Sequence, residues 1–356
     1  DISQQRVPVC AGSLTRYAGF SQLLTAACRP RIPSASHGDF QGSRESSNMS
    51  LKKETPSAQL LHLAALQGNL PLLVSVLDSG KVYVDCKDQE GTTALIIACA
   101  NNNYDCAKEL LEQGANPAAK RVTGTTALFF AAQGGYLDIA RLLLEHNAPV
   151  DAASVDGGTP LLVACQCNHL DVVEELVKAG ASIHTQMSDR ATPLFVAAQN
   201  GHLDLVSHLI ALNADINIKR TDGATALWIA SQMGHTAVVA ELLAHGAEVD
   251  STRHDGATPL FKAAHKGYAG LVELLVKRGA SLGLLRNGES ALHAAALFDH
   301  LSVIKLLLAA GADPQLRNQD GMTPLDLALE ASNTQIVDYL RQHIATRRLP
   351  DSMRAS

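Results

Sequence analysis

The sequence predicts an all-α repeat solenoid, and three observations lead to this fold class. A frame of the form G-x-T-[PA]-L returns along the chain at steps of 33 residues, with one step of 32. Each copy holds a short and a longer helical segment, separated by a turn that contains glycine or asparagine. Hydrophobic residues make up 46% of the chain but aromatic residues only 4%, so the core must consist mainly of alanine and aliphatic side chains. Such side chains suit closely stacked helices.

The copies are aligned by the first residue of the frame. A weaker first copy, SAQLLHLAA, begins at Ser57, and the later copies have this residue at Gly91, Gly124, Gly157, Arg190, Gly223, Gly256, Gly288 and Gly321. The two helices of one unit are each too short to persist alone, so the unit must bury its apolar face against its neighbours. We therefore expect about nine copies in one continuous stack.

Each first helix carries a start signal. A threonine or serine hydroxyl can accept a hydrogen bond from an unpaired amide of the first turn, and a following proline has a suitable φ. A glycine then ends many of the second helices, where a left-handed φ is needed. The expected caps are Thr93, Thr126, Thr159, Thr192, Thr225, Thr258, Ser290 and Thr323.

The segments TPLFVAA, GHLDLV, LLAHGAEVD and DGATPL are the ones by which the chain resembles the ankyrin repeat family, from Ser57 to His343. The resemblance implies two antiparallel helices and a β-hairpin finger in each copy, stacked into a curved solenoid. It also implies that partner proteins are held on the concave side, by fingertip residues and by the two positions after the Ala-Ala pair of the first helix.

The chain is expected to divide into three parts. Residues 1–48 are polar and predict a disordered leader or a non-native extension. Residues 49–343 hold the repeats, and residues 344–356 form a polar tail for which disorder is also expected.

The charge and the cysteine content of the chain limit the kinds of partner and the compartment that can be expected. The formal net charge of −6 and the shortness of the basic clusters argue against nucleic acid. No run of apolar residues approaches the length that a membrane-spanning helix needs. The seven cysteines have no disulfide-framework spacing, which fits a reducing compartment. The sequence therefore predicts a cytoplasmic protein, or one shared with the nucleus, that is monomeric and binds another protein.

The only tryptophan, Trp228, occupies a position that recurs in every copy. This position is His62 in the first copy and His293 in the eighth, and it is mostly aliphatic or aromatic between them. One interpretation is an apolar ladder in the core, where burial of each large side chain contributes roughly 1.5 to 3 kcal/mol. The alternative is an exposed aromatic hot spot in the groove.

Two sets of polar residues are candidates for partner binding. A long amide side chain adds little to a core but offers a donor and an acceptor to an extended peptide. Such side chains recur at Gln133, Gln166, Gln199 and Gln232, followed by His265 and Lys266 in the next copy. The second set lies at the fingertips, at Asp156, Asp189, Asp222 and Asp255. Each aspartate could serve only its own turn. Together they predict negative potential and a groove for a polar or basic extended segment.

No residues predict catalysis, a metal or a cofactor. The sequence lacks GxxxxGK[ST], GxSxG and HExxH, and the histidines follow the repeat period instead of converging on one place. Cys165 and Cys167 have no second cysteine pair, and Cys165 stands at an alanine position, so a structural role is favoured over zinc binding.

The sequence therefore predicts a non-enzymatic scaffold or adaptor, with a regulatory or substrate-recruiting subunit of an enzyme complex as the alternative. Leu282, Leu284 and Leu285 raise a competing binding mode, because they are either packed under a shortened loop or form an exposed patch. The segment LIALNADIN resembles the ankyrin-finger context that asparaginyl hydroxylase modifies, which raises hydroxylation at Asn217 as a hypothesis. The alternative is that the frame serves only the turn, as in many ankyrin fingers.

Overall fold

The repeat frame folds into pairs of antiparallel helices. The computed structural model describes residues 55–286 and 288–347, and this part contains eighteen α-helices in nine successive pairs, which we call repeats one to nine. The first helices of the pairs are α2 (Pro56–Gln67), α4 (Ala94–Ala100), α6 (Ala127–Gly134), α8 (Pro160–Cys167), α10 (Pro193–Asn200), α12 (Ala226–Met233), α14 (Pro259–Lys266), α16 (Ala291–Leu297) and α18 (Pro324–Glu330).

The second helices are α3 (Leu70–Asp78), α5 (Tyr104–Glu112), α7 (Leu137–Glu145), α9 (Leu170–Lys178), α11 (Leu203–Ala211), α13 (Thr236–Ala244), α15 (Ala269–Lys277), α17 (Leu301–Ala309) and α19 (Thr334–Arg347). The last of them continues to Arg347, beyond the boundary at residue 343 that the sequence predicts. Residues 1–48 and most of the tail lie outside the described residues.

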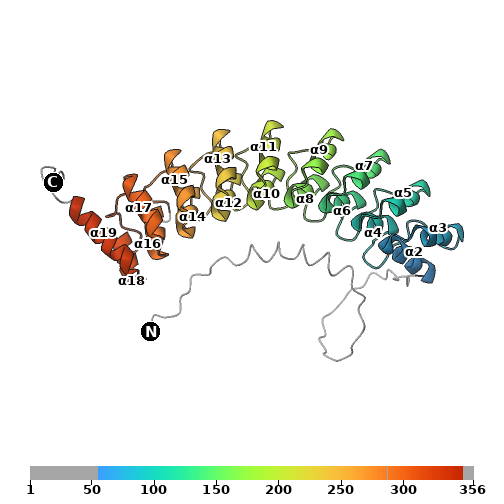
Figure 1. The fold of residues 1–356 in the computed structure, drawn as a ribbon, viewed down its shortest axis with the longest axis horizontal. Coiled ribbons are helices and arrows are strands. Elements are labelled where there is room, and N and C mark those ends of the chain that lie inside the picture. Colours follow the sequence, from blue (N-terminus) through green and yellow to red (C-terminus); the bar gives the residue numbers. More distant parts are fainter. Residues whose placement is uncertain (1–54, 287, 348–356) are drawn as a thin grey trace, which may run out of the picture. The chain divides into compact units, whose positions relative to one another are not determined.

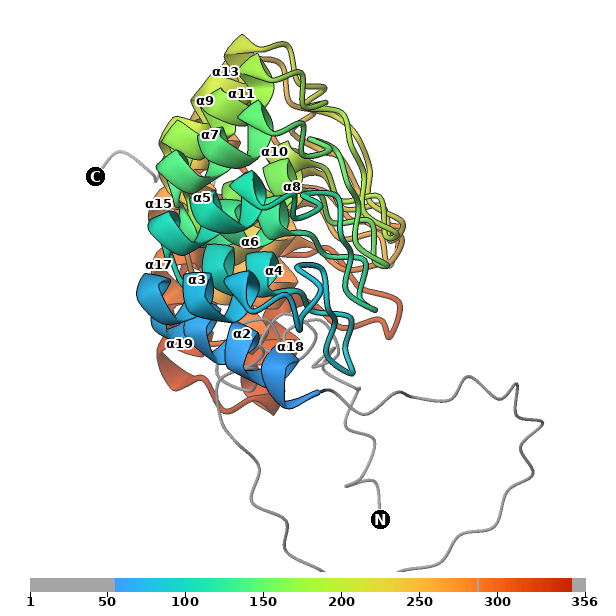
Figure 2. The ribbon, with the colours of Figure 1, turned by 90° about the vertical axis from the view of Figure 1, so that its right-hand side faces the viewer.

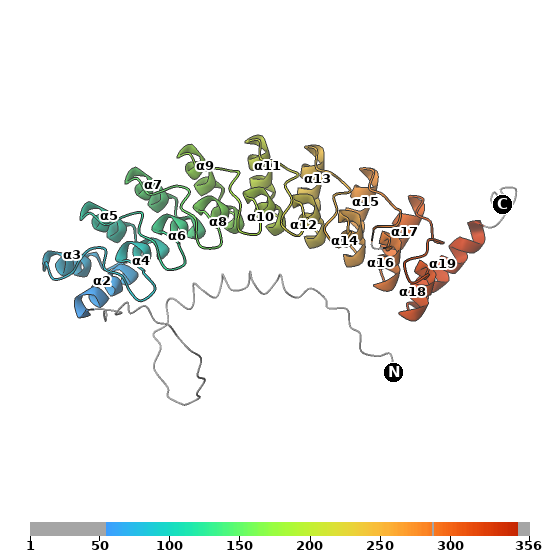
Figure 3. The ribbon, with the colours of Figure 1, turned by 180° about the vertical axis from the view of Figure 1, so that it is seen from behind.

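Within this repeat unit the helices form two layers. Each first helix packs against the first helix of the next repeat, and most second helices pack against the next second helix (Figure 1). The row of pairs bends so that the first helices lie on the inner side, as the view from behind also shows (Figure 3). The loops between repeats extend from one edge of the two layers (Figure 2). The all-α repeat solenoid predicted from the sequence is confirmed.

The expected helix starts are confirmed by their hydrogen bonds. In repeats two to nine the threonine or serine before the first helix has extended backbone, and its hydroxyl accepts from the backbone N–H three residues on. Thr323 adds a capping box, because the Asp326 carboxylate accepts from the Thr323 N–H. These local bonds satisfy amides that would otherwise lack partners at the start of each helix.

Small side chains set the spacing between repeats. The Ala131-Ala132 and Ala197-Ala198 pairs are 0% exposed and belong to one hydrophobic core that runs from Leu61 to Leu340. Because alanine brings little side-chain bulk, neighbouring first helices can approach closely and exclude water along the whole row. The stability of each short helix pair therefore depends on the repeats on either side of it.

A second inter-repeat connection uses the residue that precedes each second helix. The Nε2 atom of His169 lies 3.1 Å from the Gln133 carbonyl, and His202, His235 and His300 make the same contact to the preceding repeat at 3.0 Å. A carbonyl oxygen only accepts, so each ring nitrogen donates. Asn103 and Asn333 replace the imidazole with an amide that donates to the same part of the preceding repeat. The periodic histidines are thus accounted for as structural ties.

Tight turns form the fingers between repeats. In each of the eight fingers the marker residue donates its N–H to the carbonyl three residues earlier, as from Gly223 to Arg220 at 2.8 Å. A second bond closes the turn, as from the Arg220 N–H to the Ala224 carbonyl at 2.9 Å. Two bonds make a hairpin turn but no regular ladder, so the expected β-hairpin fingers contain no strand within the described residues. Arg190 adopts the left-handed φ of 68° that glycine supplies at the other markers.

Consecutive fingers are joined by backbone hydrogen bonds. These bonds run from Val122 to Glu90, Val155 to Thr123, Ser188 to Asp156, Thr221 to Asp189 and His254 to Asp222, each at 2.9 Å. The fingers lie so close that a Cβ on Gly157 would meet Met187 Cα at 3.0 Å. The fingers after repeats one to six therefore form one hydrogen-bonded edge beside the helices.

Candidate functional site

The first helices line the inner side of the repeat unit, and the fingers extend from its edge (Figures 1 and 2). Gln133, Gln166, Gln199 and Gln232 occupy one position in repeats three to six, and all four are half-buried. The backbone carbonyls of Gln133, Gln166 and Gln199 each accept from the histidine of the next repeat, which fixes these three main chains. Their side-chain amides make no hydrogen bond to the part of the chain that the structure describes. We call these four side chains the glutamine row.

The fingertip aspartates serve their own turns. The carboxylates of Asp189, Asp222 and Asp255 each accept from the backbone N–H two residues on, at 3.0 to 3.2 Å. Asp156 instead accepts from the Ser154 hydroxyl at 2.5 Å. These are the local bonds for which turns favour aspartate. Turn chemistry alone accounts for the residue type at these positions.

Arginines neutralise part of this acidic set. Arg220 donates to Asp222 from both Nε and Nη2, at 3.0 and 2.5 Å, and Arg253 Nε lies 3.1 Å from the same carboxylate. Burial raises the pKa of Asp222, but the hydrogen bonds from Arg220 and Ala224 and the charges of Arg220 and Arg253 outweigh it and lower the pKa to about 2. The continuous negative potential expected at the fingertips is therefore wrong at Asp222, because the structure places two guanidinium groups against it.

The same arginines lie over the apolar ladder. Arg220 Cζ is 5.0 Å from the centre of the Phe195 ring, and Arg253 Cζ is 5.3 Å from the centre of the Trp228 ring. A cation over an aromatic face is attracted by the ring quadrupole. The sequence interpretation missed these residues, although Arg121, Arg220 and Arg253 occupy one finger position and their shared register with the aromatic ladder was a usable signal.

Trp228 belongs to the core. Its side chain is 1% exposed and packs in a second hydrophobic cluster with Phe195, Leu162 and the finger residues Ala224 and Ala257. Its Nε1 donates to the Ala257 carbonyl of the following finger at 2.8 Å. The exposed hot spot that the sequence left open at Trp228 is thus wrong, because the neighbouring repeat and finger cover the ring.

The histidine of the eighth copy makes an equivalent bond. His293 Nε2 lies 3.1 Å from the Met322 carbonyl, again at the residue after the marker glycine of the next finger. Ser290 Oγ, 2.7 Å from Nδ1, can donate to the other ring nitrogen, which leaves Nε2 as the donor. Trp228 therefore makes the same hydrogen bond between first helix and finger that His293 makes, and its larger ring also adds apolar volume to the core.

Repeat seven replaces the glutamine row with basic residues. His265 of α14 is half-buried against Phe298, with ring centres 4.2 Å apart, and Lys266 is exposed. Burial lowers the pKa of His265 to about 4, with further lowering by the charges of Lys262, Lys266 and His300. At neutral pH this imidazole is uncharged, so the positive charge of α14 comes from its lysines.

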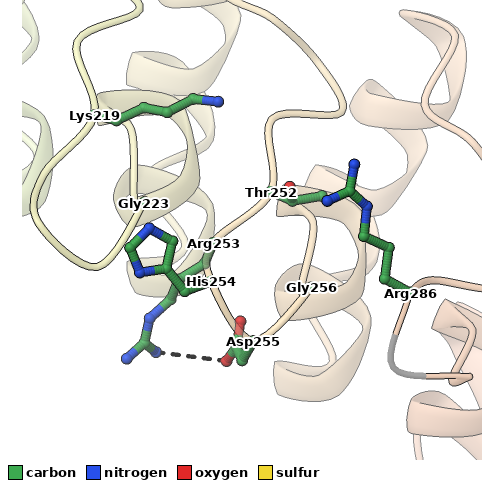
Figure 4. A pocket seen from close by; sticks show the side chains of 8 residues that line it. All are labelled: Lys219, Gly223, Thr252, Arg253, His254, Asp255, Gly256 and Arg286. Carbon is green, nitrogen blue, oxygen red and sulfur yellow. Dashed lines mark ion pairs between the residues drawn. The ribbon is translucent and has the colours of Figure 1, made fainter.

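A hollow of about 560 Å³ lies among three successive fingers. Figure 4 shows Lys219 from the first finger, Thr252, Arg253, His254 and Asp255 from the second, and Arg286 from the third. The Arg286 guanidinium is turned toward Thr252, and Arg253 Nη1 lies 3.7 Å from Asp255 (Figure 4). We call this the finger hollow. Of the four predicted fingertip aspartates it contains only Asp255, and it contains none of the glutamine row.

Two further predictions concern loops. Asn217 Oδ1 accepts from the Glu248 N–H at 3.0 Å and its Nδ2 donates to the Gly246 carbonyl at 3.1 Å, so the side chain ties two repeats together. Its hydroxylation stays a prediction. The three leucines of the shortened loop differ: Leu282 packs against the core, Leu285 is half-buried and Leu284 is exposed.

The five cysteines of the described residues are free thiols. Cys165 is fully buried, and burial raises the pKa of its thiol to about 12, so the thiolate that would bind a metal is disfavoured. Residues 55–286 and 288–347 contain no group of three or more His, Cys, Asp or Glu placed to hold a metal ion. No helix in this part of the chain is long and apolar enough to cross a membrane.

Comparison with known proteins agrees with this architecture. The family described as "Ankyrin repeats (3 copies)" matches residues 61–154, 113–187, 149–222, 194–286 and 283–348, which together span most of the chain. The chain belongs to the ankyrin repeat family.

Individual relatives match over shorter stretches. The chain is 54% identical over 68 residues to ankyrin repeat domain-containing protein 29 of Danio rerio and 52% identical over 68 residues to the protein of that name in Homo sapiens. Each alignment covers 19% of this chain and 23% of the relative. The human SH3 and multiple ankyrin repeat domains protein 2 is 33% identical over 64 residues, which are 18% of this chain and 4% of that protein. The chain thus matches about a quarter or less of the length of these relatives.

Proposed function

We propose that this protein is a non-enzymatic scaffold or adaptor that binds a partner protein along the inner surface of its repeats. Ankyrin repeats are protein–protein interaction modules. The supporting observation is the glutamine row: four half-buried amides at one repeat position, whose side chains are not hydrogen-bonded to the described residues, while a histidine of the next repeat holds the backbone carbonyl of three of them. Each amide can donate two hydrogen bonds and accept others.

A row of this kind suits an extended segment. An extended peptide presents alternating N–H and C=O groups along its length, and side-chain amides can pair with either. Val163, Val196 and Ile229 of the same helices are buried, with 4 to 7% of each exposed. A partner would therefore meet a rigid floor with polar groups at regular intervals, which limits the entropy lost on binding. A polar segment is the partner chemistry that the row favours.

The experiment is proximity labelling in cells, comparing the intact protein with a Gln166→Ala, Gln199→Ala, Gln232→Ala triple variant. We expect the variant to lose its main labelled partners, because three amides that contact the partner are removed. A matched control changes Asp171, Asp204 and Thr236 to alanine, since these exposed residues belong to the second helices of the same three repeats.

Thermal unfolding followed by circular dichroism checks that both variants keep their helices. An unchanged set of labelled proteins in the glutamine variant, or equal losses in both variants, would exclude the glutamine row as the binding surface. If an enzyme complex dominates the labelled set, the alternative of a substrate-recruiting subunit replaces the scaffold interpretation.

A further inference from the structure

The seventh finger differs from those before it in length. The step between Gly256 and Gly288 is 32 residues, whereas the other steps between successive frame markers are 33. One residue is therefore missing between the second helix of repeat seven and the turn that ends at Gly288. The bond from the Arg286 N–H to the Asp255 carbonyl, which would continue the finger ladder, is not formed between these two described residues. Among the described residues the last bond of the ladder is the one from His254 to Asp222, and the finger hollow lies beside this break.

Positive charge collects around the hollow. Lys219, Arg253 and Arg286 line it together with His254, and Asp255 is its one acidic lining residue. Arg253 is already paired with Asp222 and Asp255. Within the described residues no carboxylate forms an ion pair with Lys219 or Arg286, and both side chains are exposed. Two cations on either side of the middle finger are thus available to an anionic ligand.

The charge continues onto the neighbouring first helix. Lys262 Nζ lies 5.5 Å from the centre of the Trp228 ring, on which Arg253 also lies. Lys266 follows one turn later on α14 and is exposed. Of the acids nearby, Asp222 is paired with two arginines, whereas Glu289 keeps its charge while it accepts from the neutral amide of Asn318 at 3.1 Å. The lining of the hollow itself carries Lys219, Arg253 and Arg286 against the single carboxylate of Asp255, so its local charge is positive although the whole chain has a net charge of −6.

We propose that the finger hollow binds an acidic peptide segment, with its carboxylates between Lys219 and Arg286. This inference rests on the proposed function, because it assigns the charge of the partner at the fingers that follow repeats five to seven. A segment with a polar stretch for the glutamine row and an acidic stretch for the finger hollow would complement both regions.

The hollow favours a peptide over other polyanions. Its cations come from three separate fingers and surround a concave space, so they fit a narrow chain with single charges at intervals. A nucleic acid needs a longer basic track for its closely spaced phosphates, and Asp222 and Asp255 interrupt such a track here. A flat anionic membrane would meet the exposed fingertips but leave the concave space unfilled. The peptide is the occupant that uses the whole site.

The test is fluorescence anisotropy with the full chain and a fluorescein-labelled octa-glutamate peptide. We expect binding that weakens as salt is raised, because the contacts are between charges. The double variant Lys219→Glu, Arg286→Glu should weaken binding by at least about tenfold, since two attractive charges become repulsive. The matched control is Lys120→Glu, because Lys120 is exposed and occupies the finger position of Lys219 three repeats earlier, outside the hollow.

Each outcome has a defined meaning. Absence of binding to octa-glutamate, an unchanged affinity in the double variant, or an equal loss in Lys120→Glu would overturn the proposal. Stronger binding to phosphatidylserine vesicles than to the peptide, lost in the double variant, would assign the hollow to a membrane and also overturn it. A phosphoserine peptide that binds no more tightly than octa-glutamate supports carboxylates as the ligand, and a much tighter phosphopeptide overturns that assignment.

These results are separable from the proposed function. The triple glutamine variant keeps Lys219 and Arg286, so we expect it to bind octa-glutamate like the unmodified protein. If the glutamine variant loses its cellular partners but the peptide test fails, the proposed scaffold function is retained. The proposal that the finger hollow binds an acidic segment is then rejected. Circular dichroism of the double variant confirms that reversed charges have not unfolded the repeats.

Discussion

In repeat six the first helix α12 carries Trp228, Ser231 and Gln232, whereas the corresponding positions of α14 in repeat seven carry Phe261, Ala264 and His265. Both helices begin after a threonine whose hydroxyl accepts from the amide three residues on, and both end at a glycine with left-handed φ. The backbone frame is thus the same in the two repeats. The comparison shows that the repeat frame determines the position of each side chain. The residue type at that position then determines whether the inner surface is polar, basic or covered by an aromatic ring.

The largest expected effect tests the difference in burial between Trp228 of repeat six and Phe261 of repeat seven. Trp228→Ala should lower the free energy of unfolding by about 3 to 5 kcal/mol, because it removes a fully buried side chain and leaves a cavity. Phe261→Ala should cost less, since Phe261 is half-buried. Urea unfolding followed by circular dichroism measures both. Equal losses in the two variants would contradict the assignment of Trp228 to the closed core and Phe261 to its edge.

A conservative control separates packing from hydrogen bonding in Trp228. Trp228→Phe keeps an aromatic ring at the position but removes the donor to the Ala257 carbonyl. We expect a loss of about 2 kcal/mol, since one hydrogen bond is removed and the smaller ring leaves part of the indole volume unfilled. A loss as large as that of the alanine variant would show that the bond outweighs the packing.

The next effect concerns pH and repeat seven. The pKa of His265 in the folded protein, about 4, is below its usual value of 6.5. As pH falls from 6.5 toward 4, the unfolded chain takes up a proton that the folded chain does not, so the free energy of unfolding falls. We expect His265 to account for about 1 to 2 kcal/mol of this loss, allowing for solvent screening. His265→Gln places the residue of the preceding four repeats at this position and should remove that part of the pH dependence.

The measurement is the free energy of unfolding at several pH values between 7 and 4 for both proteins. Above pH 6.5 their pH dependence should be the same, because His265 is neutral in the folded and the unfolded chain. Parallel curves throughout the range would show that the pKa of His265 is not lowered by folding.

The smallest effect removes an unsatisfied group from repeat six. Ser231 Oγ is fully buried and has no hydrogen-bond partner in the described residues, and repeat seven has Ala264 at the same position. Ser231→Ala should raise the free energy of unfolding by about 1 kcal/mol, because a desolvated hydroxyl is removed. Ser207→Ala is the matched control and should lower it, since Ser207 Oγ donates to Glu241 at 3.0 Å. A destabilised Ser231→Ala protein would reveal a bond made by this hydroxyl in solution.

Much of the fold could be predicted from the sequence because its signals are local and repeated. The threonine and serine caps and the marker residues act through backbone groups a few residues away, so their spacing of 33 specifies the helix pairs and the stacking direction. The positions of the glutamine row also followed from this period. Its role in binding stays a proposal, since a period places side chains but does not show what they contact.

Only the tertiary structure decided how charges and rings combine between repeats. Arg253 reaches Asp222 in the preceding finger and lies over Trp228, and these contacts join residues that are 31 and 25 positions apart. The sequence counts Asp222 as a negative charge at a fingertip, but the folded chain pairs it. Likewise, the loss of one residue before Gly288 is visible in the sequence, whereas the end of the finger ladder and the finger hollow beside it depend on how neighbouring fingers meet. Local hydrogen bonding specifies the repeat frame. The ion pairs and cation–aromatic contacts between repeats can be assigned only when the distances between the charged groups are known.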